Sequence, residues 1–246
     1  MREAGYPGDG EIGGNLRRVR NRVEAACRKA GRNPEEVTLI AVSKKKPWEA
    51  IREARAAGAA DFGENYVQEL QEKQAIQESE GMDGIRWHMI GHLQKNKVRF
   101  LIGRTVLIHS VDSIALAEQV EKESAKRDAV TDILMEVNVA GEESKWGFRP
   151  ENALSGAAAI AKLAHVRLRG WMTSAPYTAD GESNRPFFRE LRQLSEQAAE
   201  AGLLAEFDRN YPVPVLSMGM SCDYEAAVLE GATMIRVGTE IFGERG

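Results

Sequence analysis

The sequence has little cysteine and histidine and no long apolar run, and each shortage excludes a class of protein. Only two of its 246 residues are cysteine and four are histidine. Cys27 and Cys222 lie far apart and the histidines form no HExxH pattern, so neither a disulfide framework nor a zinc site is expected. No apolar stretch approaches the length of a membrane span, and residues 1–14 contain no apolar signal core. We therefore expect a cytoplasmic protein with no metal and no membrane partner.

The chain also lacks a strong charge of one sign and an internal linker. Its formal net charge is -4, with acidic and basic residues mixed along the sequence, which argues against nucleic acid as a partner. With 43% hydrophobic and 28% charged residues it can form a sizeable core. No segment rich in proline, glycine and serine divides it. We expect a flexible N-terminal segment at residues 1–14 and one domain at residues 15–246.

Short apolar runs alternate with longer helical patterns, as in repeated βα units. Eight strands are expected, at residues 38–43, 60–62, 85–90, 106–109, 133–139, 166–172, 213–218 and 234–237. Helical spacing is clear at residues 48–57, 114–126, 153–163 and 187–201, and a leading amphipathic helix is expected at residues 12–31. Eight parallel strands inside a ring of helices form a TIM-type (β/α)8 barrel, for which about 250 residues is the usual size. The sequence thus predicts an α/β protein, a single TIM-type barrel with an extra N-terminal helix. A doubly wound sheet is the competing fold, but its GxGxxG fingerprint is absent after the first strand.

Lys44 is the first candidate for chemistry because it stands where the first apolar strand ends. Barrels of this class carry their active sites at the carboxyl ends of the strands. Partial burial and the like charge of Lys46 would favour the neutral amine that Schiff-base formation needs. The alternative is that Lys44 and its two lysine neighbours are a solvated strand end.

Two further residues follow strand ends and a third lies inside a strand, and each has a structural alternative. Asn65 could contact a ligand or cap the next helix. Lys145 could balance a phosphate, or it could be an exposed lysine among glutamates. His88, inside an apolar strand, is more typical of a structural histidine than of a catalytic one. Trp171 and Met172 are expected to be packing residues.

The last two strands end in small residues, hydroxyl groups and glycine. Loops after strands seven and eight often bind phosphate in barrels. The residues expected to form such a site are Ser217, Met218, Gly219, Ser221, Arg236, Gly238 and Thr239. Glycines allow close approach of the backbone, hydroxyl groups donate hydrogen bonds, and arginine supplies a cation that stays protonated. Each turn alone could be an ordinary β-to-α turn. Together with an amine on strand one, they indicate a phosphate-bearing aldehyde.

These motifs resemble the YggS/PROSC family of pyridoxal 5'-phosphate (PLP) homeostasis proteins, whose barrel is related to the N-terminal domain of alanine racemases. The resemblance covers the chain from the leading helix to the C-terminus and rests on AVSK at 41–44, FGENYVQE at 62–69, WHMIG at 87–91, LQKNK at 93–97, SMGMS at 217–221 and RVGT at 236–239. It implies that Lys44 forms an internal aldimine with PLP and that residues 217–221, Gly238 and Thr239 hold the phosphate. It also implies that Arg236 faces the pyridine nitrogen, with Asn65 and Lys145 in supporting positions. The sequence departs from the family pattern at Cys222, and at His92, where proline is common.

The resemblance implies a protein of intracellular vitamin B6 homeostasis that carries or buffers PLP, with no catalytic residue. A permanent charge on Arg236 would keep the ring nitrogen unprotonated and weaken the ring as an electron sink. Racemisation also needs an acid/base group on each face of the substrate, and alanine racemases take one from a second domain, for which this chain is expected to lack room. The alternatives are a PLP-dependent amino-acid racemase and a phosphate-binding barrel enzyme without PLP. PLP-requiring apoenzymes are the expected partners, and family analogy suggests a monomer.

Overall fold

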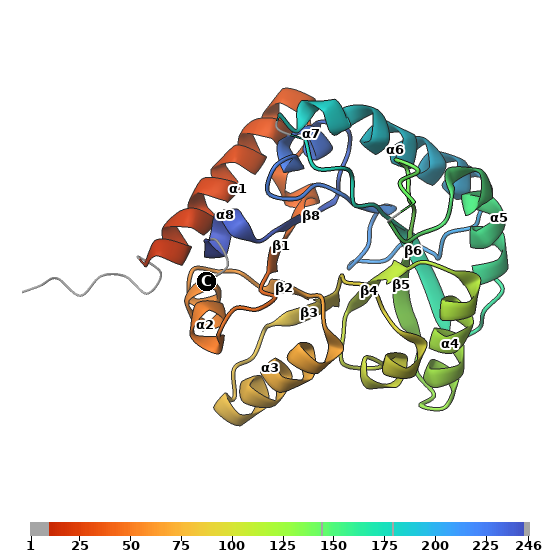
Figure 1. The fold of residues 1–246 in the computed structure, drawn as a ribbon, viewed down its shortest axis with the longest axis horizontal. Coiled ribbons are helices and arrows are strands. Elements are labelled where there is room, and N and C mark those ends of the chain that lie inside the picture. Colours follow the sequence, from red (N-terminus) through yellow and green to blue (C-terminus); the bar gives the residue numbers. More distant parts are fainter. Residues whose placement is uncertain (1–9, 144, 179, 244–246) are drawn as a thin grey trace, which may run out of the picture.

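The computed structural model describes residues 10–143, 145–178 and 180–243 as a ring of strands surrounded by helices (Figure 1). The strands are β1 (Thr38–Val42), β2 (Asp61–Glu64), β3 (Arg86–Met89), β4 (Leu107–Val111), β5 (Thr131–Glu136), β6 (Val166–Met172), β7 (Val215–Ser217) and β8 (Met234–Val237). The α-helices are α1 (Glu11–Ala30), α2 (Trp48–Ala56), α3 (Val67–Glu80), α4 (Ile114–Ala125), α5 (Pro150–Ile160), α6 (Arg185–Glu200), α7 (Tyr224–Leu229) and α8 (Thr239–Phe242). Short 3₁₀ helices occur at η1 (Pro34–Glu36), η2 (Lys95–Phe100) and η3 (Glu182–Asn184).

The eight strands form one closed parallel barrel in which each strand pairs with the next along the chain. β1 closes the ring by pairing with β8, so that Thr38 lies opposite Met234 and Ala41 opposite Val237. This confirms the predicted TIM-type barrel and rejects the doubly wound sheet. In such a barrel all strands run in one direction, so their carboxyl ends meet on one face.

The core has two parts because each strand has an inner and an outer face. The larger apolar cluster includes most buried helix residues and the strand residues that pack against them. A smaller cluster consists of Ile40, Leu107, Leu134, Met172, Tyr211, Val215 and Met234, contributed mainly by six strands. Trp171 and Met172 are both buried, as expected of packing residues.

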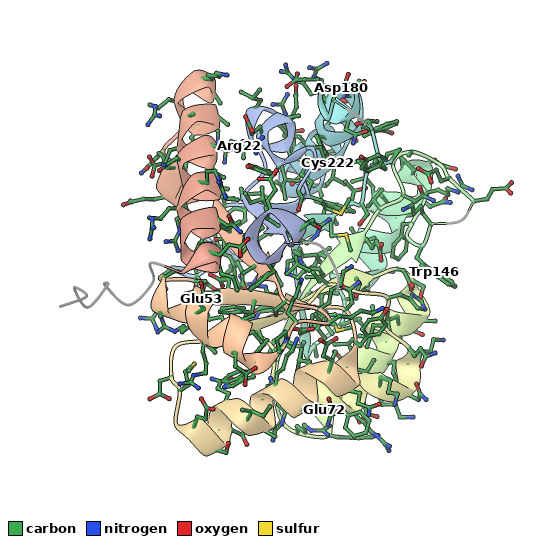
Figure 2. The ribbon with its side chains drawn as sticks, turned by 60° about the vertical axis from the view of Figure 1, so that its left-hand side comes forward. Arg22, Glu53, Glu72, Trp146, Asp180 and Cys222 are labelled. Atoms are coloured by element: carbon green, nitrogen blue, oxygen red, sulfur yellow. The ribbon has the colours of Figure 1, made fainter. Side chains whose placement is uncertain are left out.

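Helix α1 forms because apolar residues recur on one of its faces. Leu16, Val19 and Val23 are buried along this stripe, and Gly31 ends the helix with a left-handed φ of 67°. Figure 2 shows α1 along one side of the barrel, with Arg22 labelled on it. Arg22 forms ion pairs with Glu225 at the start of α7 and with Glu240 in α8. The leading helix is thereby attached to the last two helices.

The predicted strands agree with the structure in order and number and differ from it at their ends, whereas α3, α7 and α8 were not among the predicted helices. Residues 166–172 and 234–237 are strands as predicted, whereas β2 begins one residue later than expected and continues to Glu64. Helix α1 begins at Glu11, so residues 11–14 are helical and the prediction of a flexible segment was wrong there. Residues 1–9 of that segment lie outside the described part. Among the described helices, none combines the length and apolar character needed to cross a membrane.

Candidate functional site

A cavity of about 570 Å³ opens at the carboxyl ends of the strands. Six of the ten predicted site residues line it, namely Lys44, Asn65, Ser221, Arg236, Gly238 and Thr239. They come from loops after β1, β2, β7 and β8 and from β8 itself, so the barrel brings together residues almost 200 positions apart. Its other lining residues are Val42, Ile90, Ser174, Tyr177, Met220, Cys222 and Glu240. The predicted amine and the predicted phosphate loops therefore share one cavity.

Lys44 is partly buried and lies two residues after the end of β1. The chain turns sharply there, since Lys45 has a φ of 58°, a left-handed conformation that is uncommon outside glycine. The ammonium of Lys46 donates to the carbonyls of Phe242 and Gly243 at 3.0 and 3.2 Å, at the end of α8. Lys46 is thus committed to a structural contact, while Lys44 lines the cavity.

A buried polar network fixes the backbone on both sides of Lys44. The Lys73 ammonium, from α3, donates to the Ser43 carbonyl at 2.7 Å and to the Glu64 and Glu69 carboxylates at 2.6 and 2.7 Å. The Ser43 hydroxyl also donates to Glu64, and Glu69 accepts the backbone N–H of Lys45. Burial raises the pKa of Glu64, and Lys73 opposes that shift. The network holds the residues before and after Lys44 to β2 and α3.

The loops after β7 and β8 are tied together at the cavity. The Gly238 N–H donates to the Ser221 hydroxyl oxygen at 3.3 Å, and the Arg236 N–H donates to the Gly219 carbonyl at 3.0 Å. Gly219 has a φ of 91°, and an added Cβ would lie 2.8 Å from the Tyr224 Cα, so only glycine fits. Among the described residues, the backbone N–H groups of Ser221 and Thr239 have no backbone acceptor. Open backbone N–H groups on neighbouring loops suit an anion.

Arg236 places a buried cation at the cavity. It is 4% exposed; one terminal nitrogen donates to both oxygens of Ser217 at 2.7 Å and the other donates to the Thr173 carbonyl at 2.8 Å. Burial lowers the pKa of Arg236 to about 10, a shift that the nearby Glu136 and Asp223 oppose. The guanidinium therefore remains protonated at neutral pH.

The other four predicted residues lie outside the cavity lining. Ser217, Met218 and Gly219 are buried behind it, where Ser217 binds Arg236 and Met218 belongs to the core. Lys145 is exposed and lines a neighbouring hollow together with Asp112, His92 and Trp146. The rings of His92 and Trp146 are stacked at 4.1 Å between centroids, and Figure 2 labels Trp146 on the side away from α1.

Sequence reasoning missed Lys73 and Glu136. Burial, together with the nearby Asp112 carboxylate, raises the pKa of Glu136 to about 7, although Arg236 and Lys145 oppose the shift. An acidic residue within the apolar run 133–139 was a visible signal for Glu136. Lys73 carried only the weak signal of a lysine four residues after Glu69 on a helix.

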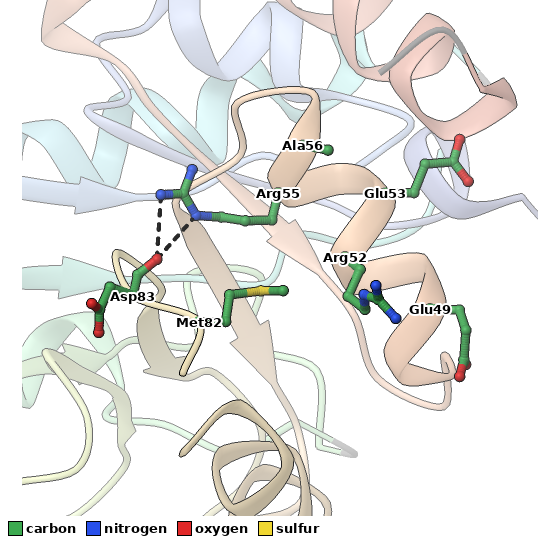
Figure 3. A pocket seen from close by; sticks show the side chains of 7 residues that line it. All are labelled: Glu49, Arg52, Glu53, Arg55, Ala56, Met82 and Asp83. Atoms are coloured by element: carbon green, nitrogen blue, oxygen red, sulfur yellow. Dashed lines mark hydrogen bonds between the residues drawn. The ribbon is translucent and has the colours of Figure 1, made fainter. Parts of the chain in front are cut away.

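A larger hollow of about 630 Å³ lies on the outside of the barrel, between α2 and the loop after α3 (Figure 3). Arg55 crosses it and donates to the Asp83 carbonyl at 3.4 and 3.3 Å. Glu53, also in its lining, accepts the Ile12 N–H at the start of α1. These contacts join helices, and none of the predicted site residues is present, so the Lys44 cavity is the better candidate.

Comparison with known proteins agrees with this fold. The family model described as "Alanine racemase, N-terminal domain" matches residues 14–246. The pyridoxal phosphate homeostasis protein of Aquifex aeolicus is 44% identical over 231 residues, which cover 94% of this chain and 96% of that protein. PipY of Synechococcus elongatus, solved with PLP bound, superimposes with a TM-score of 0.79 at 35% identity, covering 95% of this chain and 100% of PipY.

An alanine racemase from Clostridium difficile has the same fold, with a TM-score of 0.69 at 16% identity. The match covers 94% of this chain and 56% of the racemase. At that identity the likeness shows a common fold and nothing about function. By its full-length match to curated relatives and to the family model, the chain belongs to the pyridoxal phosphate homeostasis proteins, a family built on the alanine racemase N-terminal barrel.

Proposed function

We propose that this protein holds PLP at Lys44 and carries or buffers it for PLP-requiring apoenzymes, without efficient catalytic turnover. The observation that carries the proposal is the single cavity lined by Lys44, Arg236 and the loops after β7 and β8. The names of the relatives support it, as does the PLP-bound structure of PipY.

The residues of the cavity fit the three functional groups of PLP. A volume of about 570 Å³ is within the usual range for small-ligand sites. The open N–H groups of Ser221 and Thr239 suit the phosphate, the Lys44 amine suits the aldehyde, and Arg236 suits an unprotonated ring nitrogen. When bound, PLP supplies an aldehyde that condenses reversibly with a primary amine. Asn65 lines the same cavity, where it would support the bound ring.

The charge on Arg236 favours carriage over racemisation. With a pKa of about 10 the guanidinium keeps its proton at neutral pH, so a ring nitrogen facing it stays unprotonated. An unprotonated ring withdraws electrons poorly, and the carbanion that racemisation requires gains little stabilisation. The cavity can thus bind and release the cofactor while supporting little chemistry on an amino acid. We propose that one chain suffices for this task, which size-exclusion chromatography with light scattering would test.

Attachment is tested by comparing wild type with Lys44→Ala and the neighbouring Lys46→Ala after addition of PLP. Borohydride reduction followed by peptide mapping should find the adduct on Lys44 in wild type and in Lys46→Ala, and no adduct in Lys44→Ala. The Lys44→Ala barrel should remain folded by circular dichroism, because the change removes a partly buried amine and opens no large core cavity. An adduct on Lys46 or Lys145 would move the site, and no adduct in any protein would refute PLP binding.

Turnover is tested separately by incubating the PLP-loaded protein with enantiopure amino acids and following them by chiral chromatography. Little or no inversion is expected over many hours. Sustained inversion that disappears in Lys44→Ala would contradict the carrier function and show that the protein is a racemase.

A further inference from the structure

Five polar side chains cross the inside of the barrel in an unbroken series of hydrogen bonds. The Arg236 guanidinium contacts the Ser217 hydroxyl at 2.7 Å, and that hydroxyl contacts the His109 Nδ1 at 2.9 Å. The His109 Nε2 lies 3.0 Å from the His88 Nδ1, and the His88 Nε2 lies 3.0 Å from the Asp61 carboxylate. The series begins at the Lys44 cavity and ends at the first residue of β2, at the opposite end of the barrel.

If His88 and His109 each carry one proton, the two ends of this series determine the direction of every bond in it. A guanidinium can only donate and an ionised carboxylate can only accept. Although burial alone would raise it, the pKa of Asp61 is lowered by hydrogen bonds from His88 and Arg86, so Asp61 is ionised at neutral pH. Burial, with the neighbouring His88 and the Arg236 cation, lowers the pKa of His109 well below its usual value, so this ring is neutral.

With these constraints Arg236 donates to Ser217 and Ser217 donates to the His109 Nδ1. His109 then carries its proton on Nε2 and donates to His88, and His88 carries its proton on Nε2 and donates to Asp61. The reverse direction would direct both His109 and Arg236 at the Ser217 oxygen and leave the Ser217 hydroxyl proton without an acceptor. Ser217 is completely buried, so that loss would be costly.

We propose that Asp61, His88 and His109 are positioning residues that act through Ser217 to fix the Arg236 guanidinium at the cavity. Asp61 sets the direction of the hydrogen-bond series. That direction leaves the Ser217 oxygen as an acceptor for Arg236 alone. A residue at the amino-terminal end of the barrel thereby controls a contact at the carboxyl-terminal end. The inference rests on the proposed function in one respect, namely that the ligand positioned by Arg236 is PLP.

The decisive variant is Asp61→Leu, which is close in size and cannot accept a hydrogen bond. Without the carboxylate, nothing requires the His88 proton to stay on Nε2. The form in which both histidines carry the proton on Nδ1 should therefore gain population, limited by the cost to the Ser217 hydroxyl. Asp61→Asn keeps a carbonyl acceptor and should restore the original direction. The matched control is Asp132→Leu, since Asp132 also lies at the start of a strand and pairs with Arg167 and Arg169 but contacts no member of the chain.

Two measurements on the cofactor-free protein test the chain without relying on PLP. Long-range ¹H–¹⁵N spectra should show the proton on Nε2 of both histidines in wild type, Asp61→Asn and Asp132→Leu, and a larger share on Nδ1 in Asp61→Leu. Rotation about the Arg236 Cζ–Nε bond should be slow in the first three proteins and faster in Asp61→Leu. Unchanged histidine protons in Asp61→Leu, or the same changes in Asp132→Leu, would overturn the proposal.

A third measurement connects the chain to the ligand. Asp61→Leu should bind PLP roughly fivefold more weakly than Asp132→Leu, a usual size for coupling between separated sites. If wild type bound no PLP, the proposed function would be wrong. The two measurements on the cofactor-free protein would still decide whether Asp61, His88 and His109 position Arg236. If Asp61→Leu did not fold, His109→Phe would serve, because it keeps a ring and removes both nitrogens. Slow rotation of the Arg236 guanidinium in that variant would contradict the proposed positioning of Arg236 by the hydrogen-bond series.

Discussion

The Lys73 ammonium and the Glu64 carboxylate are 2.6 Å apart, and their side chains are only 7% and 0% exposed. Both charges are almost completely removed from water, so each depends on the other and on the hydrogen bonds around them. Because the same ammonium holds the Ser43 carbonyl, the pair couples the stability of the barrel to the backbone that presents Lys44.

Lys73→Met should therefore destabilise the protein by about 3–5 kcal/mol, the usual cost of removing one partner of a buried pair. Lys126→Met is the control, since Lys126 lies 2.7 Å from Glu123 but is 54% exposed. That change should cost less than about 1 kcal/mol. Urea unfolding of both variants gives the comparison, and equal costs would show that burial of the Lys73 pair is unimportant.

The titration of Glu136 should make stability depend on pH. Its pKa is raised to about 7 in the folded protein, so the folded state binds this proton more tightly than the unfolded state does. The stabilisation is complete below the ordinary pKa of 4.5 and is lost as pH rises through about 7.

Relative to Glu136→Gln, wild type should lose at most about 3 kcal/mol of unfolding free energy across this range. Unfolding in urea at several pH values from about 5 to 8 would measure the difference. A difference that does not change with pH would show that Glu136 titrates normally. Asp112, Arg236 and Lys145 are the charged groups that act on it, so each is left unchanged in both proteins.

Two glycines should respond in opposite directions to alanine. A Cβ at Gly91 would lie 2.4 Å from the backbone oxygen of Asn65, while nothing lies within 4 Å of one at Gly14. Gly91→Ala should cost about 1–3 kcal/mol and displace Asn65 at the cavity. Gly14→Ala, within α1, should stabilise by about 0.5–1 kcal/mol. Thermal unfolding of both variants would measure these changes in stability. An unchanged stability in Gly91→Ala would show that the backbone at Asn65 moves away without cost.

Asn65 should matter for binding and hardly for folding. The residue at the N-terminal cap of α3 is Tyr66, so Asn65 is not the cap that its sequence position allowed. Asn65→Ala should change the unfolding free energy by less than about 0.5 kcal/mol and weaken PLP binding. Ser113 does cap α4 by accepting the Leu116 N–H, and Ser113→Ala should cost about 1 kcal/mol with unchanged PLP affinity. A large stability loss in Asn65→Ala would contradict this assignment.

The barrel was predictable because its strands are apolar runs with clear ends. Hydropathy works well for residues 166–172, where the predicted and observed strands coincide. It works less well for β2, whose first and last residues are the buried charges Asp61 and Glu64. Their partners, Arg86, His88 and Lys73, come from later segments, and no local pattern announces such pairing.

The site was predictable in its location and less so in the task of each residue. Lys44, Ser221 and Thr239 follow strand ends, and parallel strands bring such residues to one face. The Ser217 hydroxyl was expected to serve the phosphate, and instead it contacts Arg236 and His109. That outcome depends on which side chains meet inside the barrel, and hydrophobic periodicity does not contain this information.

The pairing of β1 with β8 has a consequence for how the chain folds during synthesis. Thr38 and Met234 become neighbours only when nearly the whole barrel has been made. Until then one edge of β1 presents unpaired backbone groups, which are a template for aggregation. Contacts so distant in sequence form slowly. A newly made chain should therefore depend on protection by chaperones until β8 has emerged from the ribosome and closed the ring.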